Sequence, residues 1–160
     1  MKRTQIAAAS IGLALAAPVA AQETIRIGHA TPETSPIHEA LVYFEDEIES
    51  RSDGEMQVEL FPGGQLGSVQ EMTELVQSGN ITMTTGASVL LSSTVAELAV
   101  LDQFLLFEDE EKARAVLDGP AGEKLGEAVE DRDLKLMGFM ELGFRSFTNS
   151  RAPLDSVEAF

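Results

Sequence analysis

Residues 24–88 read TIRIGHATPETSPIHEALVYFEDEIESRSDGEMQVELFPGGQLGSVQEMTELVQSGNITMTTGAS. Three short segments of this stretch, residues 24–28, 56–61 and 81–83, alternate apolar with polar side chains, as half-buried strands do. Two longer segments lie between them and repeat apolar residues at intervals of three and four, as one face of a helix does. The stretch therefore predicts the element order β-α-β-α-β.

Capping residues predict the limits of both helices. Pro36 suits a first helical position, and Gly54 suits the end of the same helix. Ser68 and Glu71 have capping-box spacing at the start of the second helix, which Gly79 ends. These local signals agree with the apolar periodicity.

The order β-α-β-α-β predicts parallel strands joined by right-handed crossovers, with each helix packed back on the sheet. Ligands of such sheets bind outside the carboxyl ends of the strands. Two loops meet this condition, residues 28–31 and residues 84–88, and both are rich in small or polar side chains. The alternative interpretation of either loop is an ordinary strand-to-helix turn.

The composition excludes several classes of protein. The chain has 160 residues, no cysteine and no tryptophan, so disulfide scaffolds, zinc ribbons and cysteine nucleophiles are ruled out. It carries 27 acidic and 11 basic residues, for a formal net charge of −16. Such a charge repels a phosphate backbone, so nucleic acid is not an expected partner.

The first 21 residues have the build of a secretory signal peptide. Lys2 and Arg3 are followed by an apolar run from Ile6 to Ala17 and by small residues up to Ala21. The run is shorter than the ~20 residues that a membrane span needs. We expect residues 1–21 to be removed on export and the product to be soluble in the periplasm, with an uncleaved membrane anchor as the alternative.

The second half of the chain is less regular. Residues 109–117 and 121–131 are predicted helices. Residues 134–142 alternate apolar with other side chains and predict a long strand, which Gly143 interrupts and residues 144–149 continue.

Few side chains offer catalytic or metal-binding chemistry. His29 and His38 are the two histidines of the chain, and no metal-ligand spacing, nucleophile elbow or phosphate loop accompanies them. His29 ends the first predicted strand, whereas His38 in the first turn of a helix is interpreted as a surface or capping residue. Neither a metal site nor a cofactor is expected.

Arg145 is the candidate for binding an anion. It follows the interruption at Gly143 and stands between Phe144 and Phe147. A guanidinium group matches a carboxylate with two parallel hydrogen bonds, which is the usual way to hold a small organic acid. A structural salt bridge with one of the many acidic residues is an equally good interpretation from the residues alone.

Several segments together are similar to one family. They are Gly28-His29-Ala30 followed by Ser35-Pro36 and His38, then Phe61-Pro62-Gly63-Gly64-Gln65-Leu66-Gly67, Glu71, Gln77-Ser78-Gly79, and Gly143-Phe144-Arg145 with Thr148-Asn149-Ser150. In this order and behind an export signal, they resemble the extracytoplasmic solute-binding subunits of tripartite ATP-independent periplasmic (TRAP) transporters, of the DctP type. The resemblance runs from about Thr24 to the last residue.

The resemblance implies an α/β fold of the periplasmic binding protein-like type II kind, with a parallel βαβαβ core. Residues 1–21 are then the signal peptide, residues 22–142 form lobe I, and residues 143–160 are a crossover strand and the start of lobe II. The resemblance also implies that the chain is an amino-terminal fragment, truncated before most of the second lobe.

The resemblance further implies a function. Such a protein is not an enzyme; it closes around a small organic acid, such as a dicarboxylate, and delivers it to the membrane permease subunits of a transporter driven by an ion gradient. The arginine of the Gly-x-Arg segment contacts the ligand, and the loops after the first and third strands line the cleft. The residues that this places at the ligand are Arg145, His29, Ala30, Ala87 and Ser88.

Two departures from the family pattern stand out. Family members commonly have Pro before Phe where this chain has Gln103-Phe104. The chain also stops at Phe160, before the segment that carries the second ligand-clamping arginine. We therefore expect the 160-residue chain to bind organic acids weakly or not at all, and to expose apolar surface that a second lobe would cover.

Two other classes of function remain open from the residues alone. One is a periplasmic enzyme that uses His29 with a nearby carboxylate. The other is a secreted interaction module with an exposed apolar patch and no small-molecule site.

Overall fold

The computed structural model of the chain describes residues 22–144 and residue 150. The predicted signal peptide and the predicted strand 144–149 therefore lie outside the described residues, apart from Phe144. Within the described part, no helix is both long and apolar enough to cross a bilayer. The elements, in chain order, are β1 (Glu23–His29), α1 (Pro36–Arg51), β2 (Met56–Phe61), α2 (Val69–Gln77), β3 (Met83–Thr85), α3 (Ser88–Leu91), the 3-10 helix η1 (Ala96–Asp102), α4 (Glu110–Leu117) and α5 (Pro120–Glu130).

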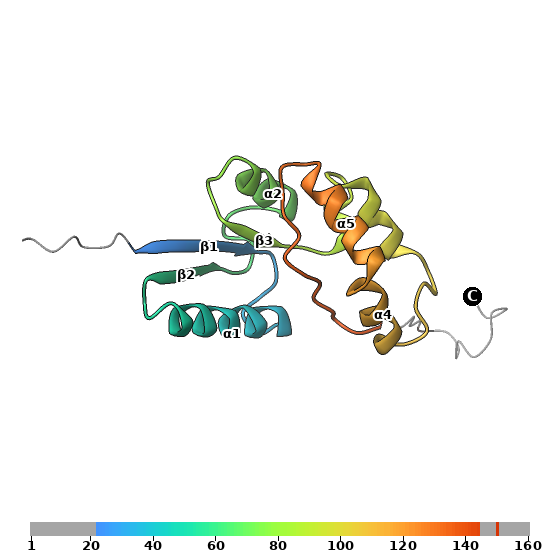
Figure 1. The fold of residues 1–160 in the computed structure, drawn as a ribbon, viewed down its shortest axis with the longest axis horizontal. Coiled ribbons are helices and arrows are strands. Elements are labelled where there is room, and N and C mark those ends of the chain that lie inside the picture. Colours follow the sequence, from blue (N-terminus) through green and yellow to red (C-terminus); the bar gives the residue numbers. More distant parts are fainter. Residues whose placement is uncertain (1–21, 145–149, 151–160) are drawn as a thin grey trace, which may run out of the picture.

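The predicted βαβαβ core is confirmed. The three described strands form one parallel sheet in the order β2-β1-β3 (Figure 1). The central strand β1 pairs with β2 over six residues and with β3 over three. Figure 1 shows α1 and α2 on opposite sides of the sheet, as expected for right-handed crossovers.

Each face of β1 packs against a different helix. Ile25 and Ile27 are buried together with Ile37 and Leu41 of α1. Gly28 faces the other way, and a Cβ atom built on it would lie 2.7 Å from the sulfur of Met72 in α2. Successive residues of a strand point to opposite faces, so the helices cover both faces of this strand.

Both core helices begin at a capped residue, and the capping box predicted for α2 is confirmed. The Ser35 side chain accepts a hydrogen bond from the His38 backbone N–H at the start of α1. At α2, Ser68 Oγ accepts from the Glu71 N–H at 3.3 Å, and the Glu71 carboxylate accepts from the Ser68 N–H at 2.7 Å. The Ser68 hydroxyl also donates to the Glu71 carboxylate, and because the bonds from the Ser68 N–H and hydroxyl stabilise the ionised carboxylate, they lower the pKa of Glu71.

The second half of the chain forms its own apolar cluster. Val95 and Leu98 of the η1 region are buried against Leu125 and Val129 of α5. Leu91 of α3 touches both this cluster and the cluster that lies under α2. These two apolar clusters are therefore joined through α3.

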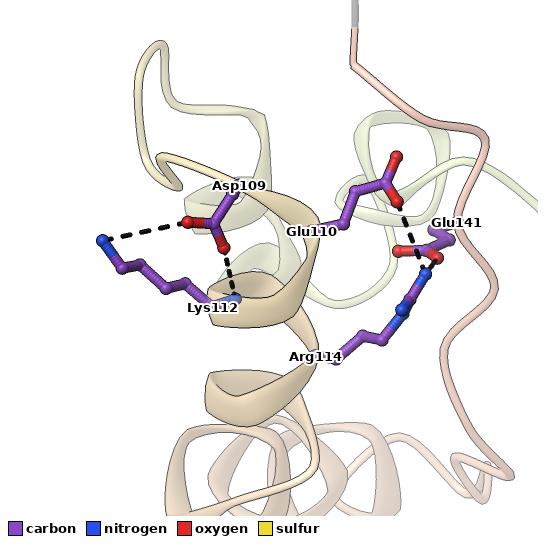
Figure 2. Close-up of polar contacts among 5 residues, drawn as sticks. All are labelled: Asp109, Glu110, Lys112, Arg114 and Glu141. Carbon is purple, nitrogen blue, oxygen red and sulfur yellow. Dashed lines mark hydrogen bonds and ion pairs between the residues drawn. The ribbon is translucent and has the colours of Figure 1, made fainter.

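The predicted strand at residues 134–142 is wrong. The segment has no regular secondary structure, because no described strand lies beside it to complete a hydrogen-bonded ladder. Leu134, Leu136 and Phe139 pack on the second apolar cluster, and their spacing departs from strict alternation at Gly138. Figure 2 shows how the end of the segment is held: Arg114 of α4 bridges Glu110 of its own helix and Glu141.

Large apolar side chains are exposed in this half of the chain, as expected. Leu105 is 98% exposed in the connection between η1 and α4, and Met137 and Leu142 are each 69% exposed.

Candidate functional site

The loops that follow the strands meet at the carboxyl edge of the sheet. The Gly63 N–H donates to the carbonyl of Thr31 at 2.9 Å, and the Gly64 N–H donates to the carbonyl of His29 at 3.0 Å. Both glycines have positive φ angles, 62° and 73°, which favour glycine over other residues. The glycine-rich turn after β2 thus fixes the loop after β1.

The loops after β1 and β3 are neighbours in the same way. Gly28 pairs with Thr84 and His29 with Thr85 in the parallel register. The Thr84 hydroxyl also donates to the carbonyl of Gly28 at 3.0 Å. Because parallel strands end at the same edge, the two loops predicted to line a ligand cleft lie side by side.

The predicted site residues of these two loops differ in accessibility. Ala30 and Ala87 are exposed, and Ser88 is partly buried at the start of α3, a short helix that the sequence pattern did not indicate. Ser88 Oγ donates to Asp102 Oδ1 at 3.3 Å, while Asp102 Oδ2 is buried without a hydrogen-bond partner in the described structure. The polar groups of this loop are thus held partly inside the fold.

His29 lies at the strand end as predicted, but its side chain is fully buried. Its Nδ1 is 2.8 Å from Thr31 Oγ1, and its Nε2 is 3.1 Å from His38 Nδ1. The two imidazole rings are tilted by 42°, with centroids 5.2 Å apart. His29 therefore reaches the surface through its partners and not directly.

His38 is the residue that sequence reasoning undervalued. Its backbone N–H is capped by Ser35, as a residue in a first helical turn should be, but its ring also forms a buried contact with His29. The signal was available: a helix that packs back on the strand before it brings its first turn over the end of that strand.

The environment of His29 favours its neutral form. Burial lowers the pKa of His29 below its usual value, and a positive charge on His38 would lower it further, whereas a hydrogen bond at Thr31 opposes the shift. At neutral pH the imidazole is therefore uncharged, and its two nitrogens divide between one donor and one acceptor.

The neutral His29 contributes to the free energy of unfolding. We expect this contribution to be complete above the ordinary pKa of 6.5 and to be lost as the pH decreases toward the lowered pKa of His29. In that window the unfolded chain binds more protons than the folded chain, so acid favours unfolding. One proton limits the loss to about 1.4 kcal/mol per pH unit. Urea unfolding at about pH 7.5 and about pH 6.0 measures it, and a His29→Gln variant with the same slope as the native chain would contradict this origin.

The remaining predictions for the site concern anion and metal binding. Arg145 lies outside the described residues, so the structure gives no position for its side chain. Within residues 22–144, no group of three or more histidine, aspartate and glutamate side chains could hold a metal ion.

A parallel α/β sheet covered by helices on both faces, with polar loops gathered at its carboxyl edge, is a fold that binds ligands at that edge. The comparisons with known proteins agree. The chain belongs to the family described as bacterial extracellular solute-binding protein, family 7 (DctP), which matches residues 27–160.

Two curated relatives illustrate the family. The chain is 35% identical over 134 residues to the 2,3-diketo-L-gulonate-binding periplasmic protein YiaO of Escherichia coli K12, a match that covers 84% of this chain and 41% of the relative. It is 27% identical over 137 residues to the C4-dicarboxylate-binding protein DctB of Bacillus subtilis, covering 86% and 39%. The chain thus spans about two fifths of the length of these relatives.

Solved structures show the same fold. A TRAP periplasmic solute-binding protein from Ochrobactrum anthropi superimposes with a TM-score of 0.82 at 34% identity, covering 87% of this chain and 43% of that one. The sugar acid binding protein DctPAm from Advenella mimigardefordensis, in complex with galactonate, gives a TM-score of 0.76 at 34% identity, covering 81% and 42%. The fold class expected from the sequence is confirmed.

Proposed function

We propose that the chain supplies one lobe of a periplasmic TRAP solute-binding protein that captures a small organic acid and delivers it to the membrane permease subunits. Residues 22–142 form lobe I, residues 143–160 lead toward the second lobe, and residues 1–21 direct export. The observation that carries the proposal is the convergence of the loops after β1 and β3 at one edge of the sheet. Ligands of open parallel sheets bind at this edge.

The class of ligand follows from the relatives. Solved structures of similar solute-binding proteins hold galactonate, succinate or L-gulonate, all of which are carboxylates. A carboxylate needs hydrogen-bond donors and a nearby cation, and Arg145 offers both. We place Arg145, Ala30, Ala87 and Ser88 at the ligand, with His29 acting from beneath the loop.

The alternative functions have less support. An enzyme that uses His29 would need a reacting substrate to reach it, but the ring is fully buried and its hydrogen-bond partners are Thr31 and His38. A secreted interaction module would account for exposed apolar residues such as Leu105, yet the family consists of solute-binding proteins. We therefore propose neither catalysis nor a cofactor.

Isothermal titration calorimetry of the complete gene product tests the proposal. The panel holds C4-dicarboxylates, aldonates and uronates, with the neutral sugars of equal carbon number as controls. We expect at least one acid to bind with a micromolar or lower Kd, and the neutral sugars not to bind. Equal affinity for an acid and its neutral analogue would overturn the proposal.

Replacement of Arg145 by alanine is expected to weaken binding of that acid at least ten-fold, because a charge-assisted hydrogen bond contributes about 1.5–3 kcal/mol. Arg145→Lys should recover only part of the loss, since an ammonium group cannot form the two parallel bonds. Arg132→Ala is the matched control, because the Arg132 side chain is exposed and its backbone carbonyl, not its guanidinium, accepts a bond from Gln77. If the Arg145→Ala variant binds the acid with unchanged affinity, Arg145 does not contact the ligand and has only a structural role.

A further inference from the structure

Three polar side chains form a row at the carboxyl end of β1. Thr31 Oγ1 is 2.8 Å from His29 Nδ1, and His29 Nε2 is 3.1 Å from His38 Nδ1. The middle residue is fully buried, whereas Thr31 and His38 are partly exposed. The row thus connects two places on the surface through a buried imidazole.

When both rings are neutral, the row has two hydrogen-bond directions. In the first, the Thr31 hydroxyl donates to His29 Nδ1, and His29 Nε2–H donates to His38. In the second, His38 Nδ1–H donates to His29 Nε2, and His29 Nδ1–H donates to Thr31 Oγ1. Each neutral imidazole carries one N–H and one lone pair, so both directions satisfy all four atoms.

When the row of side chains takes up one more proton, Thr31 Oγ1 can only accept the hydrogen bond from His29. In the first arrangement both histidine lone pairs already accept hydrogen bonds, so the row takes up a proton only after His29 Nδ1–H turns to donate to Thr31. The buried His29 disfavours a charge, whereas His38 at the other end of the row is partly exposed. Thr31 Oγ1 now accepts from inside the fold, and its own hydroxyl proton is free to point outward.

Charged side chains of both signs lie around His38. His38 lines an open cavity of about 600 Å³ between α1 and β2, together with Arg26, Glu45 and Glu59. Arg26 forms an ion pair with Glu59 at 3.3 Å, and Glu45 of α1 lines the same cavity beside His38. Burial raises the pKa of Glu45, as do Glu49 and Asp46, while His38 lowers it, in keeping with a favourable interaction between the two groups.

Thr31 itself is well placed to meet a solute. Its carbonyl is held by the Gly63 N–H at 2.9 Å, so the loop after β1 is fixed at the edge of the sheet. A carboxylate accepts hydrogen bonds and cannot donate them. An outward hydroxyl proton on Thr31 would therefore favour a solute carboxylate, whereas the reverse direction presents only lone pairs.

We propose that Thr31 is a further solute-contacting residue, and that His29 and His38 are positioning residues that aim its hydroxyl at the solute carboxylate when the pair holds a proton. This inference rests on the function proposed above. The affinity for an organic acid then increases at mildly acidic pH. The row of hydrogen bonds that causes this increase begins at the cavity between α1 and β2.

Calorimetry of the complete gene product at about pH 8 and about pH 5.5, with an acid that is ionised at both values, tests the link. We expect binding to be about ten-fold tighter at the lower pH, the effect of one hydrogen bond to a charged group. Thr31→Val should remove this dependence, and Thr31→Ser, which keeps the hydroxyl, should retain it. Absence of binding at every pH overturns the proposed function, whereas binding with equal affinity at both values overturns the present proposal.

A second measurement needs no solute. Imidazole nitrogen NMR of the same protein reports whether His29 Nδ1 carries a proton, and the two histidines of the chain keep the spectrum simple. We expect a protonated Nδ1 at about pH 5.5, and loss of the pH dependence in His38→Gln, whose amide does not titrate. An unprotonated Nδ1 at that pH would overturn the row of bonds even if binding proved to depend on pH.

Discussion

Replacement of Ile27 by alanine is expected to reduce the free energy of unfolding by about 2–5 kcal/mol. Ile27 is fully buried and occupies the centre of the sheet, where it pairs with Leu60 on one side and with Met83 on the other. It shares the α1 face of the sheet with Ile37 and Leu41. Truncation removes the apolar contacts of Ile27 with β2, β3 and α1. It leaves a cavity that these two strands and the helix cannot close.

Two variants on the same strand separate the cavity from other effects. Ile27→Val removes one methylene and should cost about 0.5–1.5 kcal/mol. Thr24→Ala changes an exposed position and should stay within about 0.5 kcal/mol. Urea unfolding followed by circular dichroism gives the three values. A loss below about 1 kcal/mol in Ile27→Ala would show that this core does not determine stability.

The first half of the fold was predictable because its signals are local and agree with one another. The limits of α1 follow from Pro36 and the turn at Gly54, and those of α2 from the capping box that Ser68 opens. The parallel order then follows from the alternation of strands and helices. When capping, periodicity and topology point to the same arrangement, the sequence specifies it closely.

The second half of the fold was less predictable, because whether residues 134–142 form a strand depends on segments far away along the chain. The alternation of apolar residues over 134–142 agrees with the packing of Leu134 and Leu136 but not with that of Phe139. It could not show that no described strand lies alongside, which decides whether a ladder forms. Such tertiary conditions are absent from a local pattern.

The site shows the same division. The two loops were located by the topology of the sheet, without knowledge of any side-chain contact. The contact between His29 and His38 was not predicted, because the pattern of each element gives no information about its neighbours in space. Its detection requires the packing of α1 on β1, which turns a residue in a first helical turn into a neighbour of a strand end.

The two helices α4 and α5 offer a sharper test of packing. Gly122 of α5 is buried, and a Cβ atom built on it would lie 1.7 Å from the carbonyl oxygen of Leu117 and 2.8 Å from its carbonyl carbon. Both are backbone atoms at the end of α4, so no side-chain rotation relieves the clash. Gly122→Ala must therefore separate the two helices and disturb the nearby cluster around Leu125 and Val129.

We expect Gly122→Ala to lower the free energy of unfolding by about 2–4 kcal/mol, the range of strong overpacking. Gly126 supplies a matched control in the same helix, because a Cβ atom there would have no neighbour within 4 Å. Gly126→Ala should instead raise the stability by about 0.5–1 kcal/mol, since alanine restricts the unfolded chain and favours a helix. Opposite signs for the same substitution four residues apart are the expected result of thermal unfolding. A gain in stability for both would show that α4 and α5 do not pack closely at Leu117.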